Sequence, residues 1–321
     1  MYMFKYVMKR IGLMLLITFC IMTISFVLIK LLQPEVTQMG AQAKLELARR
    51  EALGYNKPIL EQYAIYLKNF FTNGELGVSW RIDYMKPVGA LMVSRMAPTL
   101  ILNIISILIS VPLGILFGIW AALKKNKATD HTISVAVMIF ISVPSYVVAF
   151  LLQYILGFKL GIFPLVAASL NDAGGSWLSP VMIHSLVMPI LSLSFGSIAG
   201  FARFTRAELT ECLTSEYMLL ARTKGLTRAQ ATRKHALKNA MVPILPMIIA
   251  TLSSLFGGAM ITEQIFAING MGSLMIRAIS LLDYDVFVGA TMFYTLIGLS
   301  ASLLVDLSYG FLDPRIRMGA R

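Results

Sequence analysis

Long apolar runs that contain no Asp, Glu, Lys or Arg constrain this chain more than any other feature. Five such runs cover residues 99–123, 132–156, 181–202, 240–262 and 286–305, and a sixth, residues 11–32, carries only Lys30, near its end. A helix needs about 20 consecutive apolar residues to cross a hydrocarbon core about 30 Å thick. Only 14% of the residues are charged, against about 25% in soluble domains. The sequence therefore predicts an all-α polytopic membrane protein with six transmembrane helices.

The first apolar run could instead belong to a secretory signal, because Lys5, Lys9 and Arg10 precede it. The apolar core of a signal is usually about 7–15 residues long and is followed by a small-residue cleavage site. This run is longer, and no such site lies directly behind it. We therefore interpret residues 1–32 as a cytoplasmic N-terminus and a retained first transmembrane helix.

The distribution of Lys and Arg predicts the orientation of the chain. Cations gather in the connections at residues 124–127 and 203–238 and in the tail, residues 313–321, whereas the two short connections on the opposite side hold one each. Cytoplasmic loops are enriched in Lys and Arg, and long loops are translocated largely regardless of charge. Both termini are expected in the cytoplasm, and residues 33–98, the long loop, are expected outside it. The helices from 99 to 312 are expected to form the membrane core.

This topology accounts for the net charge of +12. A strongly basic chain can indicate nucleic-acid binding. Here the excess charge lies where membrane topology places it, and no basic groove with interleaved aromatic residues is present. We therefore exclude nucleic acid as a partner and expect the lipid bilayer to be the main surrounding of the chain.

The connection between the fourth and fifth spans, at about residues 203–240, contains a basic stretch, "EYMLLARTKGLTRAQATRKHALKNAMVP". This stretch, Glu216 to Pro243, is named the basic segment. Ser215 is expected to cap a helix that ends before Gly225, and a left-handed conformation is expected at this glycine. Thr227 is followed three residues later by Gln230, which is the pattern of a capping box. The sequence predicts two short surface helices joined by a glycine elbow.

Two interpretations of the basic segment remain open from its residues alone. A run of cations can lie in solvent against anionic lipid headgroups. Small residues, in contrast, favour close docking of another surface, and five alanines occur in and just after the run: Ala221, Ala229, Ala231, Ala236 and Ala240.

The basic segment resembles the EAA loop of bacterial ABC importer permeases. That motif reads Glu-Ala-Ala, three residues, Gly, nine residues and Ile-x-Leu-Pro, and the peptide and nickel branch varies it toward "ARAKG…HALRNA". Here "LLARTKG" and "HALKN" follow the branch. Ala221, Gly225 and Leu237 match the general motif, whereas His235 replaces Ile and Lys238 replaces Pro.

Further matches occur in the same order along the chain. "NGELGVSW" at residues 73–80 is similar to a signature of the family's outer loop, and "SVPSYVVAFLL" to its third span. "ITEQIF", "NGMGSL" and "LLVDLSYGFLDPRIR" resemble its C-terminal motifs. One departure is "QPEV" at residues 33–36, where the family usually has Pro-Gly-Asp-Pro. The long loop resembles that of the B-type subunit of oligopeptide and dipeptide importers.

The resemblance implies a non-catalytic transport subunit in a bacterial plasma membrane. Its expected partners are a second homologous permease, two cytoplasmic ABC ATPases and an extracytoplasmic substrate-binding protein. ATP and Mg²⁺ would bind the ATPases, and this chain would bind no cofactor or metal. The coupling loop would seat in a groove of one ATPase; its residues are Ala221, Arg222, Lys224, Gly225, Leu226, Thr227, Ala229, His235 and Leu237. The expected cargo is a peptide, and nickel or a metal chelate is the alternative.

Chemistry of other classes has little support in the sequence. The chain has no Gly-x-x-x-x-Gly-Lys-Ser/Thr cradle for ATP. Its histidines, His131, His184 and His235, are scattered, and Cys20 and Cys212 are far apart. A secondary transporter would typically carry ionisable residues at the bilayer midplane, and a membrane enzyme would need a nucleophile or metal site. These two classes remain as weaker alternatives.

Residues that could shape the pathway lie in or near the spans. Prolines within spans are expected to kink or break helices, and Pro144, Pro189 and Pro243 are the pathway candidates. Glu263 is either a gate carboxylate or a residue at a helix end, and Asp306 is interpreted as a helix-end residue. Two pairs of glycines, Gly114 with Gly118 and Gly196 with Gly200, are expected to bring helices into close contact.

The long loop contains one helical pattern. Apolar residues recur at helical spacing after Pro58, at Leu60, Tyr63, Ala64, Leu67 and Phe71. Proline is favoured at the start of a helix. The sequence predicts an amphipathic helix at about residues 59–71, on the outer face of the membrane or in contact with the binding protein.

Overall fold

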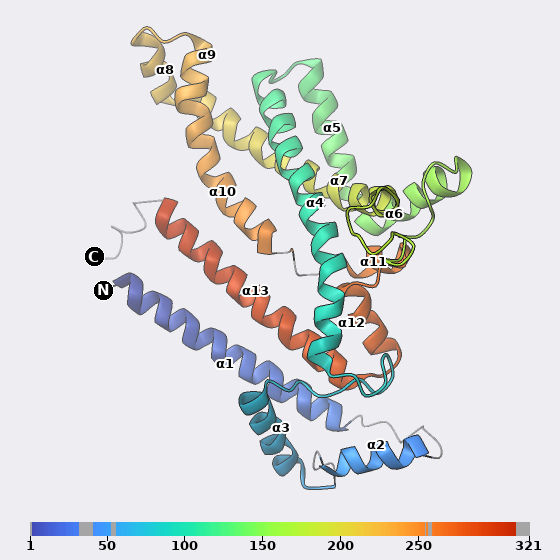
Figure 1. Cartoon of the computed structure of the whole chain (residues 1–321). Coiled ribbons are helices and arrows are strands. Elements are labelled where there is room, and N and C mark those ends of the chain that lie inside the picture. The colour runs from blue at the N-terminus through green and yellow to red at the C-terminus, as the bar shows by residue number, and fades with distance from the viewer. Residues whose placement is uncertain (1, 32–40, 53–55, 254, 256–258, 313–321) are drawn as a thin grey trace. The chain divides into compact units, whose positions relative to one another are not determined.

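The computed structural model describes residues 2–31, 41–52, 56–253, 255 and 259–312 (Figure 1). The described part of the chain contains helices and no β-strand, which agrees with the all-α prediction. The turn at residues 33–36 and the tail at 313–321 lie outside the described residues. Five helices are long and apolar enough to cross a membrane, and a bent pair gives a sixth span if it is counted as one.

The helices divide between two compact units. The first unit comprises Met1–Ala97 and Met271–Ser300, and the second comprises Pro98–Gly270 and Ala301–Arg321. Two long helices pass from one unit into the other, α4 (Val88–Leu123) and α13 (Tyr284–Leu312).

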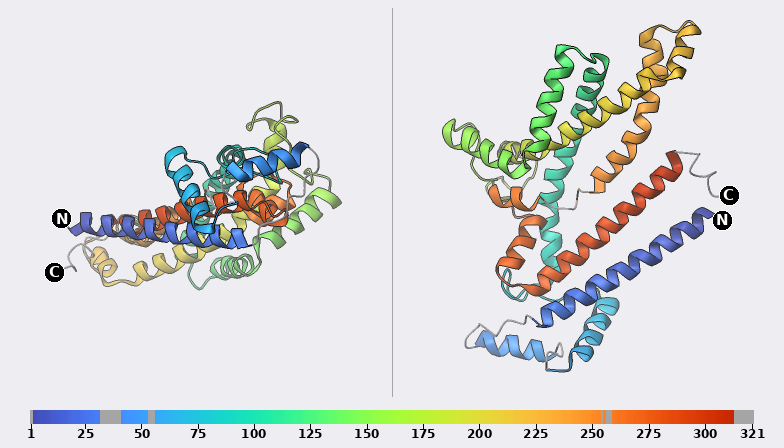
Figure 2. Two further views of the ribbon diagram at one scale, coloured as in Figure 1. Left: turned by 90° about the horizontal axis from the view of Figure 1, so that it is seen from below. Right: turned by 180° about the vertical axis from the view of Figure 1, so that it is seen from behind.

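In the first unit, α1 (Tyr2–Leu31), α2 (Ala41–Ala52), α3 (Ile59–Asn73) and α12 (Met271–Ser280) accompany the N-terminal parts of α4 and α13. Helix α3 confirms the helix expected after Pro58. Its contacts differ from the predicted stripe, because Leu60 and Phe71 are exposed. The ring of Phe26 in α1 packs instead against Tyr63 and Tyr66 of α3. Helix α3 lies beside α1 in Figures 1 and 2.

The second unit contains the remaining helices. They are α5 (Ala128–Ser142), α6 (Ser145–Leu152), η1 (Gln153–Lys159), α7 (Pro180–Thr214), α8 (Glu216–Thr223), α9 (Arg228–Ala231), η2 (Thr232–Ala236), α10 (Leu237–Ser253) and α11 (Met260–Ile265). η1 and η2 are π-helical turns. α4 runs beside α5 in Figures 1 and 2, and α7 leads to the basic segment.

Several predicted spans differ from the structure; the fourth, for example, continues in α7 to Thr214. The second begins at Val88 rather than Thr99, with Pro98 inside the helix. The third is broken: α5 and the pair α6–η1 meet at a bend of 98°, because Val143 and Pro144 are extended and Pro144 offers no N–H to continue the helix. The fifth, α10, ends at Ser253, and Thr262 belongs to the separate helix α11.

The other prolines within the expected spans lie inside continuous helices. Pro112 is in α4, Pro189 in α7, and Pro243 and Pro246 are in α10. Of the prolines that were expected to kink or break a span, only Pro144 therefore lies at a break.

The two glycine pairs behave differently. A Cβ added to Gly114 would lie 2.5 Å from Cβ of Phe201, and one on Gly118 would lie 2.5 Å from Cβ of Thr205, so α4 and α7 do approach closely there. A Cβ on Gly196 or Gly200 would meet its nearest atom only at 4.0 or 3.9 Å. The predicted close contact at this second pair is wrong.

Candidate functional site

The basic segment begins with α8, which follows α7 after the single residue Ser215. Glu216 lies in the first turn of α8, where a carboxylate interacts favourably with the helix dipole. The expected side-chain cap is absent. The hydroxyl of Ser215 instead donates to the carbonyl oxygen of Cys212 (2.6 Å), so it closes the end of α7 rather than the start of α8.

The glycine elbow has the geometry that its sequence predicted. Gly225 has φ of +88°, in the left-handed region that favours glycine. Its N–H donates to the carbonyl oxygen of Arg222 (3.0 Å), and the N–H of Leu226 donates to that of Ala221 (3.3 Å). These bonds form a Schellman motif. No atom lies within 4 Å of a Cβ added at Gly225, so glycine is favoured there by backbone conformation and not by crowding.

The capping box at Thr227 is also confirmed. The N–H of Gln230 donates to Oγ1 of Thr227 (3.3 Å), and the N–H of Thr227 donates to Oε1 of Gln230 (3.0 Å). The helix that starts here is not a separate short helix, however. α9 continues through η2 into α10, so the second half of the basic segment is the first part of a membrane-spanning helix.

The alanines of the basic segment contact the chain itself. Ala221, Ala231, Ala236 and Ala240 are buried together with Leu209 of α7 and other residues of this cluster. These four alanines therefore pack inside the chain and are not exposed to another protein surface. They hold the basic segment against its own helices, and of the five alanines only Ala229 is exposed.

The outward face of the basic segment combines apolar and basic side chains. Leu219 and Leu220 are 67% and 56% exposed. Of the expected coupling residues, Leu226 and Leu237 are half-buried, whereas the exposed ones are Arg222, Lys224, Gly225, Thr227, Ala229 and His235. Exposed apolar residues rimmed by polar ones are typical of a contact surface.

Helix α7, which carries the basic segment, is fixed to two neighbouring helices. Its contact with α4 is the close approach at Gly114 and Gly118. Its contact with α5 includes an ion pair, in which the guanidinium of Arg206 donates from Nε to Oδ1 of Asp130 (2.5 Å) and from Nη2 to Oδ2 (2.8 Å). Sequence reasoning missed this pair, because Asp130 stood just outside the uncharged run and its partner is 76 residues away.

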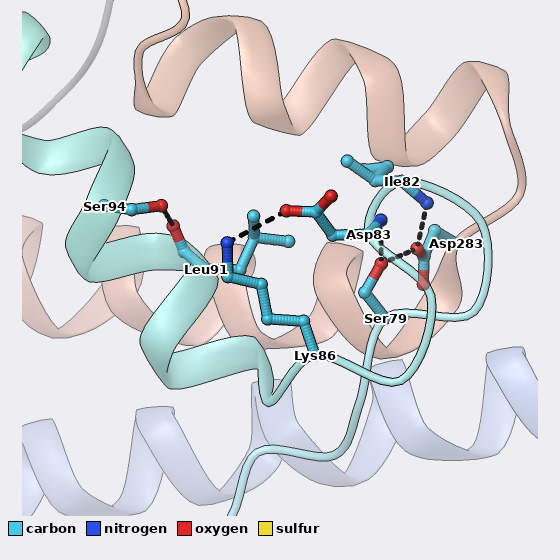
Figure 3. A network of polar contacts seen from close by, with 7 residues as sticks. All are labelled: Ser79, Ile82, Asp83, Lys86, Leu91, Ser94 and Asp283. Carbon is cyan, nitrogen blue, oxygen red and sulfur yellow. Dashed lines mark hydrogen bonds and ion pairs between the residues drawn. The ribbon is translucent and has the colours of Figure 1, made fainter.

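A second polar site was also missed, in the first unit. The carboxylate of Asp283, between α12 and α13, accepts hydrogen bonds from Ser79 Oγ (2.6 Å) and from the N–H groups of Trp80, Arg81 and Ile82 (3.2, 2.9 and 3.0 Å). Figure 3 shows its carboxylate between Ser79 and Ile82. Asp283 is fully buried, so it fixes this part of the long loop.

Asp285 completes this site, which we name the acidic latch (Asp283, Asp285 and residues 77–82). Its Oδ2 accepts from the N–H of Val78 (3.4 Å) and from Nε1 of Trp80 (3.3 Å). A Cβ on Gly77 would lie 2.7 Å from the same oxygen, and Gly77 has φ of +93°. The "GELGVSW" motif was the available signal, but its partners could not be identified from sequence.

Glu263 is a buried carboxylate in the first turn of α11, with 0% exposure. Oγ1 of Thr99 donates to Oε1 of Glu263 (2.9 Å), and a Cβ on Gly270 would collide with both side chains. The residue is therefore not at a solvated helix end, and a role in gating stays a prediction. Asp306 lies inside α13 rather than at its end, which corrects that interpretation.

Three prolines were named as pathway candidates. Pro144 is the N-cap residue of α6, Pro189 lies in α7 and Pro243 lies in α10. That they lie near a transport pathway stays a prediction. Among the residues that the structure describes, no group of three His, Cys, Asp or Glu side chains could hold a metal ion.

The chain is similar in sequence to known membrane transport proteins. Residues 114–318 match the family model described as "Binding-protein-dependent transport system inner membrane component". The dipeptide transport system permease protein DppB of Lactococcus lactis is 33% identical over 318 residues, which cover 98% of this chain and 100% of the relative. DppB of Bacillus subtilis is 33% identical over 98% of this chain and 99% of the relative.

Two further similarities are less close. The glutathione transport system permease protein GsiC of Escherichia coli is 30% identical over 98% of this chain and 99% of the relative. A crystal structure of an amino acid ABC transporter with histidines shares the fold, with a TM-score of 0.50, 20% identity and coverage of 69% of this chain and 94% of that one. The chain belongs to the family of inner-membrane components of binding-protein-dependent transport systems.

Proposed function

We propose that this chain is one of two similar permease subunits that form the membrane pathway of an ATP-driven peptide importer. The support for a peptide cargo is that relatives matched over nearly their whole length are named as dipeptide permeases. The remaining components would be two ATPases that bind ATP and Mg²⁺ and an extracytoplasmic binding protein. The termini would be cytoplasmic, and the long loop would face the binding protein.

We further propose that the basic segment couples this chain to one ATPase. The observation that supports this role is that the basic segment has an exposed face on one side and is packed against its own helices on the other. Leu219, Leu220 and Ala229 face outward, while the buried alanines of the same segment hold it on α4 and α7. A surface fixed in this way can pass a rigid-body movement of a partner to the membrane helices.

The alternative for this segment is a basic surface on lipid headgroups. Headgroup binding depends on charge, so neutral changes in shape should leave it intact. Docking in a groove depends on the direction of α8 relative to α9, which the left-handed conformation of Gly225 sets. The two roles therefore respond differently to a substitution at Gly225.

Two variants test the coupling role in the reconstituted complex. Gly225→Val places a β-branched side chain in a left-handed conformation, at a cost of about 1 kcal/mol or more, and Ala229→Glu places bulk and negative charge on the exposed face. Both should keep the permease in the membrane with its partner permease, yet reduce ATPase binding or the stimulation of ATP hydrolysis by the loaded binding protein. Gly298→Ala, in open space within α13, is the control. Normal stimulation and uptake in both test variants would show that the segment is not a coupling element.

Orientation is tested separately by labelling single cysteines in a chain that lacks Cys20 and Cys212. A membrane-impermeant reagent should reach a cysteine at Gly74 from outside intact cells, but not one at Gly225 or at residues 124–127. Labelling of position 225 from outside would reverse the proposed topology.

A further inference from the structure

The ion pair between Asp130 and Arg206 is built more tightly than a surface contact. Asp130 is 1% exposed, and both of its oxygens accept from the guanidinium of Arg206. Its Oδ2 also accepts from the N–H of Asn126 (2.9 Å), and its Oδ1 accepts from Oγ of Ser134 (3.4 Å). One carboxylate therefore ties together the turn before α5, the first turns of α5, and α7.

The position of Arg206 along α7 places the ion pair close to the basic segment. Arg206 lies eight residues before the end of α7 at Thr214, which is about 12 Å of helix, and α8 begins two residues later. α7 also cannot slide freely along α4, because the two backbones are in close contact at Gly114 and Gly118. Leu209 of α7 is buried with residues of the basic segment, so a displacement of the segment would be passed to α7 near Arg206.

On the other side of the ion pair, α5 leads to the broken span. It runs from Ala128 to Ser142 and meets α6 at the 98° bend before Ser145. Its remaining contacts with α7 are apolar: Val137 packs with Ala199 and Ala202, and the rings of Phe140 and Phe195 stack. Apolar contacts of this kind are not directional, whereas the planar guanidinium fork fixes both distance and orientation.

We propose that the Asp130–Arg206 ion pair is a positioning contact that makes α5 follow α7 when an ATPase moves the basic segment. This inference rests on the proposed coupling function and adds the route by which the movement reaches the broken span. Here the Asp130 side chain is 1% exposed and the Arg206 side chain 35%. An ion pair that removes a carboxylate from water contributes little net stability compared with well-packed apolar residues. Its distinctive contribution here is geometric, since it joins the helix next to the coupling surface to the helix that enters the bend.

Three variants separate positioning from simple folding. Asp130→Asn removes the charge, Arg206→Gln removes the cation, and Arg206→Lys keeps the cation but loses the two-point fork. Arg203→Gln is the matched control, because Arg203 is an exposed cation one turn earlier on α7. Each variant is assembled with the partner permease and both ATPases, and copurification of all subunits shows that it folds.

The first readout is the stimulation of ATP hydrolysis by the binding protein, purified with the cargo it carries. Substitutions within a coupled network change coupling by about 2- to 30-fold, and we expect a loss of about tenfold for Asp130→Asn and a smaller loss for Arg206→Lys. Asp130→Asn combined with Arg206→Gln should be no worse than the more defective single variant, because paired residues act non-additively. Arg203→Gln should behave as wild type.

The second readout needs no cargo. Spin labels at the exposed positions Val135 on α5 and Glu211 on α7 should report one narrow distance with and without ATP in the wild-type complex. Arg206→Lys should broaden or split this distance in one nucleotide state. An assembled Arg206→Lys variant with wild-type stimulation and an unchanged distance would overturn the proposal, even if Asp130→Asn fails to assemble.

Gly225→Val, measured in the same assembly, separates the two hypotheses. If Gly225→Val lowers the stimulation but the ion-pair variants do not, the positioning role is wrong and the coupling role stands. If neither Gly225→Val nor the ion-pair variants change the stimulation, the proposed coupling function itself is wrong.

Discussion

Replacing Asp283 by Asn perturbs the acidic latch without changing its volume. The carboxylate accepts three hydrogen bonds at Oδ2 and one at Oδ1. The best orientation of an Asn side chain keeps its carbonyl oxygen at the Oδ2 position, so its NH₂ group then faces the N–H of Trp80. At least one charge-assisted hydrogen bond is lost, and two donors oppose each other in a fully buried site.

The magnitude follows from the lost bond. A hydrogen bond to a charged group contributes about 1.5–3 kcal/mol, which corresponds to about 10- to 150-fold in the equilibrium for local opening. This figure is a lower bound, because the three remaining bonds also lose their charge. The segment from Ser79 to Ile82 should open more often, while α12 and α13 remain helical.

Hydrogen–deuterium exchange of the assembled complex measures this opening at the N–H groups that are themselves the donors. Exchange of the peptide that contains Trp80, Arg81 and Ile82 should accelerate by at least about tenfold in Asp283→Asn. Asp83→Asn is the matched control on the same loop, because the ion pair of Asp83 with Lys86 is about 40% exposed. Such pairs contribute about 0–1 kcal/mol, so the control should change exchange by less than about fivefold. Equal exchange in wild type and Asp283→Asn would refute the latch.

The remaining predictions concern close contacts. Gly77→Ala should lower the melting temperature of the complex more than Gly74→Ala, because both positions have a positive φ but only the first Cβ would meet a carboxylate oxygen, at 2.7 Å. Gly118→Ala should destabilise the α4–α7 contact by about 1–3 kcal/mol, whereas Gly200→Ala should be nearly neutral; equal melting temperatures for these two would contradict the packing. Glu263→Ala should reduce assembly in detergent by leaving buried N–H and hydroxyl donors without their acceptor, and unchanged assembly would show that the buried carboxylate is dispensable.

The features that sequence predicted correctly are local ones. Membrane-crossing helices require long uncharged runs, and such runs are visible in the sequence. The left-handed conformation at Gly225 and the capping box at Thr227 each depend on residues within a few positions. Local chemistry of this kind is readable without knowledge of the fold.

The features that sequence missed depend on distant partners. Asp283 and Ser79 are 204 residues apart, and neither residue alone indicates a latch. Ser215 is a common capping residue, yet its hydroxyl bonds backward to α7. The alanines of the basic segment suit close contact with any surface, and only the fold shows that α4 and α7 provide it.

The proposed coupling role requires that the exposed face of the basic segment contacts an ATPase. Photo-crosslinking tests it most directly, with a benzophenone attached to a single cysteine at Ala229 in a chain that lacks Cys20 and Cys212, inside the assembled complex. The matched control is a cysteine at Leu178, which is 78% exposed and distant in sequence from the basic segment. If the exposed face contacts an ATPase, position 229 should give a covalent product with an ATPase subunit and position 178 should give none. Lipid adducts alone from position 229, in a complex that hydrolyses ATP, would contradict it.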